Sequence, residues 1–171
     1  MTILTKTINK KRIKTTGTIL VSQKAESVFD FFANPSNDNL WRTEINKSTV
    51  NGALQVGVTI SEYSYLSKKA PDNLVELKCV QYAKDKFAIF ETFDNAPFDL
   101  RSERHVKAIS DNKTEIVYSL TFDIEIVKYA LGFALPKFIV SFKANSDMKK
   151  YLRQLKAKLE TDDKSSVISK C

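Results

Sequence analysis

Hydrophobic and polar residues alternate through the middle of the chain, which is the pattern of β-strands with one buried face. The alternation is clearest where Tyr118, Leu120 and Phe122 are separated by Ser119 and Thr121. Residues that favour turns separate the segments. The predicted strands are 13–22, 43–50, 57–66, 74–83, 86–94, 99–110 and 114–127. Because the last six follow one another with short connections, they predict an antiparallel meander.

A helical period of apolar residues occurs twice. The first instance spans 25–33, places Phe29 and Phe32 on one face, and is followed by a short polar turn over 36–41. The second begins after Gly132 and continues for more than twenty residues. A helix of that length spans about 30 Å, which is enough to cross the predicted sheet.

The length of 171 residues fits a single domain, and the mixture of strands and helices places it in the α+β class. We expect the domain to occupy residues 13–160. The polar segments 1–12 and 161–171 are expected to be flexible tails, the first of them basic.

Positive charge is unevenly distributed. The net charge of +7 comes from the first dozen residues and from the last predicted helix. A basic helix face is typical of a solvated surface, so no nucleic-acid partner is expected. The chain shows neither a secretory signal nor an apolar membrane span, and its two cysteines lack the spacing of a disulfide or zinc motif. These features favour a cytoplasmic protein.

Four parts of the sequence resemble the START-like (helix-grip, SRPBCC) superfamily, and within it the polyketide cyclase/dehydrase and lipid-transport family. They are TILVSQKAESVFDFFANPSNDNLW (18–41), Val56-Gly57, KTEIVYSLTF (113–122) and the last helix. The resemblance implies a helix-grip fold: a seven-stranded curved antiparallel sheet, two short helices after the first strand, and a long C-terminal helix across the concave face. It also implies binding or transport of a hydrophobic, lipid-like or polyketide-like molecule between sheet and helix.

Strand alternation and helix period together predict which side chains face the interior. Such an apolar lining is either a ligand site or a packed core. Trp41, at the entry to the sheet, is either a hydrophobic plug or a cavity gate. The predicted ligand-binding residues are Phe29, Trp41, Ile60, Glu62, Leu77, Ile89, Glu91, Phe93, Leu100, Arg104, Tyr118, Leu120, Phe122, Phe138 and Phe142.

Charged residues appear among the predicted inward positions. Glu91 and Arg104 fall on adjacent strands, and Glu62 joins them if Ile60 also points inward. Because an unpaired buried charge is costly, Glu91 and Arg104 form either an ion pair or a polar anchor for a ligand. The second alternative predicts a ligand with an apolar body and one polar end. A single β-bulge would instead turn Arg104 outward.

A binder without chemistry of its own is the first hypothesis. The alternative is a cyclase or dehydratase in which Glu62 or Glu91 acts as general acid and base and Tyr118 donates a proton. A third class is an interaction protein that docks through its basic helix or through the apolar segment 129–142, where Leu131 and Phe133 could touch a membrane surface. We expect a monomer or a weak homodimer.

Metal and cofactor chemistry find little support in the sequence. His105, the one histidine, is predicted to face solvent, and Cys79 is predicted to be a buried apolar filler. No nucleotide-binding motif is present, and no serine, histidine and aspartate fall into a hydrolase pattern. We therefore expect neither a metal nor a cofactor.

Overall fold

The computed structural model describes residues 11–168, and it describes side chains as far as residue 161. Seven strands form one antiparallel sheet in the order β1-β7-β6-β5-β4-β3-β2. The strands are β1 (Arg12–Val21), β2 (Ile45–Val50), β3 (Thr59–Ser64), β4 (Asn73–Ala83), β5 (Phe87–Thr92), β6 (Leu100–Ser110) and β7 (Lys113–Asp123). The helices are α1 (Ala25–Phe32), the 3-10 helix η1 (Pro35–Leu40), α2 (Glu125–Leu131) and α3 (Lys137–Ile168).

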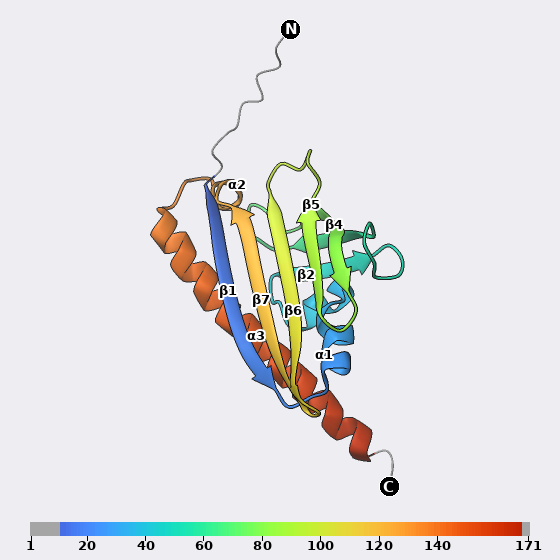
Figure 1. Cartoon of the computed structure of the whole chain (residues 1–171). Coiled ribbons are helices and arrows are strands. Elements are labelled where there is room, and N and C mark those ends of the chain that lie inside the picture. Colours follow the sequence, from blue (N-terminus) through green and yellow to red (C-terminus); the bar gives the residue numbers. More distant parts are fainter. Residues whose placement is uncertain (1–10, 169–171) are drawn as a thin grey trace.

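The chain from β2 to β7 is an unbroken meander, and β1 closes the order by pairing with β7 (Figure 1). In this pairing Ile13 lies opposite Phe122 and Val21 lies opposite Thr114. Helices α1 and η1 connect β1 to β2, and α3 runs diagonally along the sheet (Figure 1). The predicted helix-grip architecture is therefore confirmed.

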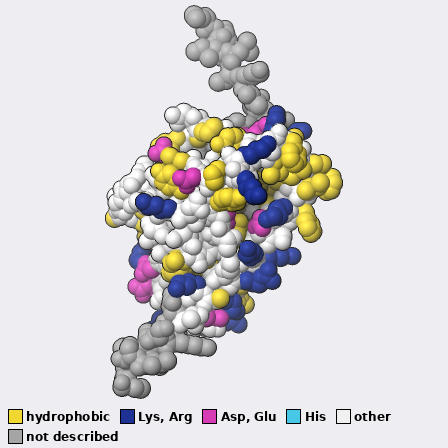
Figure 2. Space-filling view, turned by 180° about the vertical axis from the view of Figure 1, so that it is seen from behind, with side chains coloured by type: hydrophobic (Ala, Val, Ile, Leu, Met, Phe, Trp, Pro, Cys, Tyr) yellow, Lys and Arg dark blue, Asp and Glu magenta, His cyan; other side chains and the backbone are white. Residues whose placement is uncertain are grey.

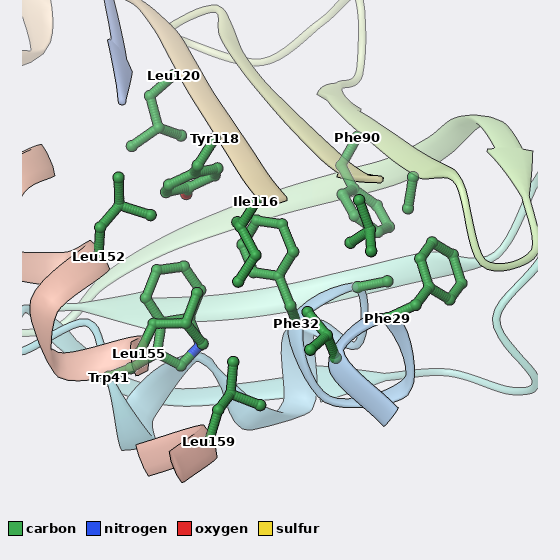
Figure 3. Packing of buried hydrophobic residues seen from close by; sticks show 14 of the residues in the cluster. Phe29, Phe32, Trp41, Phe90, Ile116, Tyr118, Leu120, Leu152, Leu155 and Leu159 are labelled. Atoms are coloured by element: carbon green, nitrogen blue, oxygen red, sulfur yellow. The ribbon is translucent and has the colours of Figure 1, made fainter. Parts of the chain in front are cut away.

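The core lies between the concave face of the sheet and the helices α1 and α3. Phe32, Trp41 and Tyr118 meet at its centre, and Leu152 and Leu155 of α3 cover them (Figure 3). The Phe32 and Tyr118 rings are perpendicular, with centroids 5.7 Å apart. Edge-to-face contacts of this kind add to the gain from burial.

Helix α3 lies against the sheet at Gly17 of β1. A Cβ atom at this position would be 2.5 Å from Cδ1 of Leu152 and 2.8 Å from Cγ of Met148. Beside it, the Thr15 hydroxyl donates a hydrogen bond to Oδ1 of Asn145 at 2.7 Å. The missing side chain of Gly17 thus permits a close contact between the first strand and the last helix.

Two predicted boundaries were wrong. The last strand ends at Asp123, four residues earlier than predicted, because the Asp123 carboxylate accepts a hydrogen bond from the backbone N–H of Glu125 at 3.0 Å and α2 begins there. At the other end, α3 continues to Ile168, whereas a flexible tail was predicted from residue 161. Most of the predicted N-terminal tail, residues 1–10, lies outside the described residues, and β1 already begins at Arg12.

The inward face of β5 was also predicted wrongly. Phe90 lies opposite the buried Ser102, and Ala88 lies opposite the buried Arg104, so these two residues face the core. Ile89 is buried on the opposite face, where it pairs with Glu103. Both alternating sets of β5 contain large apolar residues, so alternation alone could not decide between them. A register shift between Cys79 and Gln81 in the pairing with β4 changes the alignment as well.

Candidate functional site

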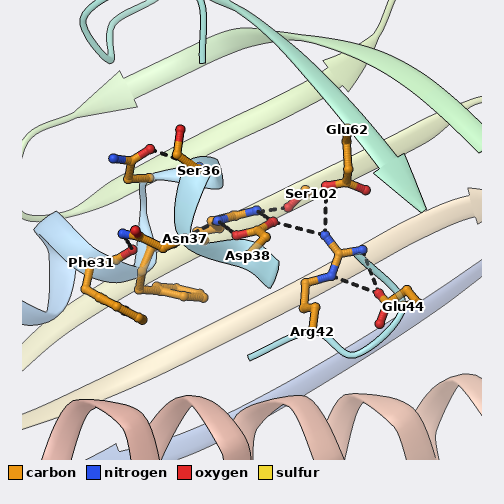
Figure 4. Close-up of polar contacts among 11 residues, drawn as sticks. Phe31, Ser36, Asn37, Asp38, Arg42, Glu44, Glu62 and Ser102 are labelled. Atoms are coloured by element: carbon orange, nitrogen blue, oxygen red, sulfur yellow. Dashed lines mark hydrogen bonds and ion pairs between the residues drawn. The ribbon is translucent and has the colours of Figure 1, made fainter. Parts of the chain in front are cut away.

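Five charged residues form a cluster between η1, β3 and β6, which we call the arginine cluster: the buried Asp38, Arg42, Glu62 and Arg104 and the half-buried Glu44 (Figure 4). Arg104 donates from Nη1 to Oδ1 of Asp38 at 2.8 Å and from Nη2 to Oδ2 at 2.6 Å. Arg42 donates from Nη1 to Asp38 at 3.1 Å and to Glu62 at 3.0 Å, and from Nε to Glu44 at 3.0 Å. Asp38 therefore joins both guanidinium groups.

Arg104 is enclosed by aromatic rings as well as by its acceptors. Its Cζ lies between 5.2 and 5.9 Å from the ring centroids of Phe32, Trp41, Phe90 and Tyr118. Nη1 also donates to the backbone oxygen of Phe32 at 2.8 Å. With 2 % of Arg104 exposed and Asp38 fully buried, this is a desolvated, bidentate ion pair inside a cation–π cage.

The local sequence explains how Asp38 reaches the interior. Asn34 accepts a hydrogen bond from the backbone N–H of Ser36 at 3.1 Å, and Pro35 occupies the first position of η1. This cap starts the short 3-10 helix, and Asp38 lies on its buried side. Arg42 follows four residues later, a spacing that allows the two side chains to meet.

The predicted pair of Glu91 and Arg104 was wrong. Glu91 faces outward, where it forms an ion pair with Arg101, directly opposite it on β6. Arg104 faces inward as predicted, but its partner is Asp38. His105 lies on the outer face beside Phe87, as its predicted outward position requires.

Charge in the arginine cluster is not balanced, since three carboxyl groups surround two guanidinium groups. Burial raises the pKa of the Glu62 carboxyl, and the neighbouring Asp38 acts in the same direction, while Arg42 opposes the shift. Burial also raises the pKa of Tyr118 to about 12, so its hydroxyl stays protonated at neutral pH. The cluster thus binds a proton at Glu62 more readily than an ordinary glutamate does.

We expect Glu62→Gln to cost at most about 2 kcal/mol of unfolding free energy at neutral pH, since Arg42 keeps two acceptors and the amide oxygen replaces the third. A raised folded-state pKa means that the native protein holds this proton more tightly than the unfolded chain does. The stability that this protonation contributes is therefore present below the ordinary glutamate pKa of about 4.3. It is lost as pH rises through the pKa of Glu62 in the folded protein. Urea unfolding across this range should show the advantage of the wild type over Glu62→Gln shrinking with pH. An advantage that grows with pH would contradict the raised pKa.

A separate hollow opens where β5 ends and the connection to β6 begins. Its volume is about 450 Å³, within the range of roughly 300–1,000 Å³ typical of small-molecule pockets. Asn73 also lines it, and the buried Nδ2 of this residue has no hydrogen-bond partner in the described chain. The lining residues are Thr59, Asn73, Leu74, Val75, Glu76, Thr92, Phe93, Asn95, Ala96, Pro97, Phe98, Leu100 and Ile126.

The predicted ligand-binding residues lie in several different places. Phe93 and Leu100 line the hollow. Phe138 and Phe142 instead face solvent on α3, with 74 % and 79 % of their surface exposed, so the prediction that they line an interior cavity was wrong. Phe122 is half-buried opposite Leu100. Those buried within the core are Phe29, Trp41, Ile60, Leu77, Tyr118 and Leu120.

Several residues of the hollow were missed. Asn73 and Pro97 fall in segments that read only as turns, and Ile126 falls where a strand was predicted. The signal in the sequence was the Asn95-Ala96-Pro97 loop, which marks the end of one strand. A strand that ends before its neighbour leaves side chains of that neighbour uncovered. Residues 73–76 of β4 extend beyond the end of β5 in this way.

A second, shallower hollow of about 630 Å³ lies between β1 and α3. Residues 16–19 form one wall, and Asn145, Lys149 and Arg153 stand on the other. Among the side chains that the structure describes, no group of three or more His, Cys, Asp or Glu is arranged to hold a metal ion. Within the described chain, no helix has both the length and the apolar character needed to cross a bilayer.

Comparison with known proteins identifies the fold. No family model matches the chain, and no curated protein sequence is significantly similar to it. Among solved structures, a START superfamily protein from Mycobacterium smegmatis is similar with a TM-score of 0.68 at 10 % identity, covering 86 % of this chain and 97 % of that one. The Zhui aromatase/cyclase from Streptomyces sp. R1128 is similar with a TM-score of 0.63 at 12 % identity, covering 88 % and 94 %.

A protein of unknown function from Staphylococcus aureus is also similar, with a TM-score of 0.68 at 8 % identity over 92 % of this chain and 99 % of that one. The matches extend over nearly the whole of each neighbour. The chain therefore has the START-like helix-grip fold that its sequence resembles. At identities this low, the likeness establishes the fold and not the activity.

Proposed function

We propose that this protein binds an apolar small molecule in the hollow at the end of β5 and catalyses no reaction on it. The observation that carries the proposal is the hollow itself: about 450 Å³, with Val75, Phe93 and Leu100 in its wall beside the polar side chains of Thr92 and Asn95. A few polar groups in an apolar pocket fix a ligand's orientation. The preferred ligand has an apolar body and one polar end.

The fold supports this proposal. A START superfamily protein and an aromatase/cyclase share the architecture. In this chain the side chains considered for catalysis lie elsewhere. Glu62 bonds to Arg42 inside the arginine cluster, Glu91 pairs with Arg101 on the outer face, and Tyr118 is buried beneath Phe32. None of them lines the hollow.

Leu100→Trp tests the site by filling it. We expect the variant to bind an anilinonaphthalenesulfonate dye at least about tenfold more weakly, which corresponds to about 1.4 kcal/mol of binding free energy. The matched control is Leu40→Trp, because Leu40 is exposed on η1 away from the hollow. Dye titration by fluorescence measures both, and native mass spectrometry of the freshly purified protein tests for a bound molecule.

Unchanged dye affinity in Leu100→Trp, with the control also unchanged, would remove the hollow as the binding site. Phe142→Trp is a further control. Because Phe142 projects into solvent from α3, enlarging it cannot fill an interior space. A loss in Phe142→Trp with none in Leu100→Trp would show that the dye binds to the exposed surface of α3 instead.

A further inference from the structure

Large apolar side chains are exposed together where α2 ends and α3 begins. We call this group the aromatic patch: Tyr129, Phe133, Phe138, Ile139 and Phe142. More than half of the surface of each is exposed except in Ile139, which is 41 % exposed. In Figure 2 hydrophobic side chains gather at the upper right and project from the outline of the molecule. Exposed apolar groups of this size on a folded domain mark an interaction surface.

The arrangement of the aromatic patch follows from the helix geometry. Phe138 and Phe142 are four residues apart on α3, so their rings stand on the same face. Phe133 precedes the helix in the connection from α2, and Gly132 allows the chain to turn there with a φ of +83°. The patch therefore combines one helix face with a protruding turn.

Positive charge surrounds the aromatic patch. From residue 125 to residue 153 the chain has six bases, Lys128, Lys137, Lys143, Lys149, Lys150 and Arg153, against two acids, Glu125 and Asp147, a net of +4. Figure 2 shows Lys and Arg side chains below and beside the hydrophobic group. Aromatic side chains that enter the boundary between lipid headgroups and acyl chains, flanked by bases that meet anionic headgroups, form an interfacial membrane anchor.

The same charges disfavour the other simple occupant, a second copy of this chain. In a two-fold symmetric dimer each patch would face its own copy, bringing like-charged lysines together around the contact. An anionic bilayer provides the complementary charge instead. Its soft interface also accepts side chains that protrude, whereas a protein partner must present a matching groove.

We propose that this protein docks on anionic membrane surfaces through the aromatic patch, with the surrounding lysines binding the headgroups. Helix α2 places this surface next to the hollow, because Ile126 lines the hollow and Tyr129 belongs to the patch. The Tyr129 ring also contacts Phe98 of the hollow's wall, with centroids 5.4 Å apart. Docking thus brings the mouth of the hollow to the lipid surface, where a ligand can be exchanged; this last point rests on the proposed function.

Vesicle flotation tests the docking. The full chain is mixed with vesicles of phosphatidylcholine alone or of phosphatidylcholine with phosphatidylserine. We expect binding to the anionic vesicles that the Phe138→Ser/Phe142→Ser double variant weakens at least about tenfold, since each aromatic ring loses its apolar contact. Lys137→Gln should weaken the binding about fivefold, the effect of one base near the surface. The matched control is Leu40→Ser/Ile109→Ser, which removes two exposed apolar residues elsewhere.

The wild type failing to bind anionic vesicles would overturn the proposal, as would equal losses in the double variant and its control. Equal binding to both kinds of vesicle would refute the role of the lysines. If the wild type forms a dimer and does not bind vesicles, and the double variant is a monomer, the patch is the contact with a second copy of this chain. Dye binding in the hollow, measured without vesicles, should be unchanged in the double variant, so the docking and the proposed function can fail separately.

Discussion

Replacing Asp38 by asparagine is expected to lower the free energy of unfolding by about 3–5 kcal/mol, because it leaves two buried guanidinium groups short of their shared counter-charge. Arg104 would lose its bidentate partner in a site where 2 % of its surface is exposed. Arg42 would retain Glu62 and Glu44. Denaturant unfolding can be followed through Trp41, the one tryptophan of the chain, whose ring lies 5.9 Å from Cζ of Arg104.

The matched control is Asp30→Asn. Asp30 also pairs with a base, Lys84, but both side chains are more than half exposed. An exposed ion pair contributes about 0–1 kcal/mol, so this variant should remain close to the wild type. Similar losses in both variants would mean that the burial of Asp38 carries no special weight, which contradicts the structure of the arginine cluster.

Arg104→Met is expected to cost a similar amount, about 3–5 kcal/mol, because it removes the bidentate pair and leaves the backbone oxygen of Phe32 without its donor. Methionine keeps an unbranched chain among the four rings, so most of the apolar packing survives. In a double-mutant cycle, Arg104→Met combined with Asp38→Asn should cost at least about 1 kcal/mol less than the sum of the single losses, since the two changes remove one shared interaction.

The same cycle with Glu91→Gln separates the two possible partners of Arg104. Glu91 and Arg104 lie on opposite faces of the sheet and share no partner, so their effects should add within about 0.5 kcal/mol. Coupling to Glu91 and none to Asp38 would show that the inward face of β5 had been correctly predicted from the sequence. That result would require a different register between β4, β5 and β6.

Strand prediction succeeded where one alternating set is apolar and the other is polar. In β7, Tyr118 and Leu120 were predicted to face inward, and both are buried in the core. In β5, Phe87 and Ile89 compete with Ala88 and Phe90, and alternation within the strand cannot decide between the two sets. The pairing of Phe90 with Cys79 and with Ser102 places Ala88 and Phe90 inward. A shift of one residue exchanges the faces of a strand, so this single error moved Glu91 to the wrong side.

The candidate hollow was only partly predictable. Phe93 and Leu100 were identified, but Asn73 and Ile126 come from segments that meet only because β5 is shorter than β4 and because α2 replaces the predicted end of β7. Phe138 and Phe142 were assigned to the interior because they continue the helical period. The helical period shows which residues share a face of the helix. It does not show over what part of the helix that face is covered by the sheet.

The sequence by itself determined the number and order of the main strands, the two helices after the first strand, the long last helix and the inward direction of Arg104. These properties follow from local periodicity and turn chemistry, which act over a few residues. Only the tertiary structure decided that Asp38, 66 residues away, is the partner of Arg104, and that the first turns of α3 remain exposed. Such contacts depend on strand register and on where the last helix crosses the sheet, and these are set by the packing of many side chains together rather than by any one segment.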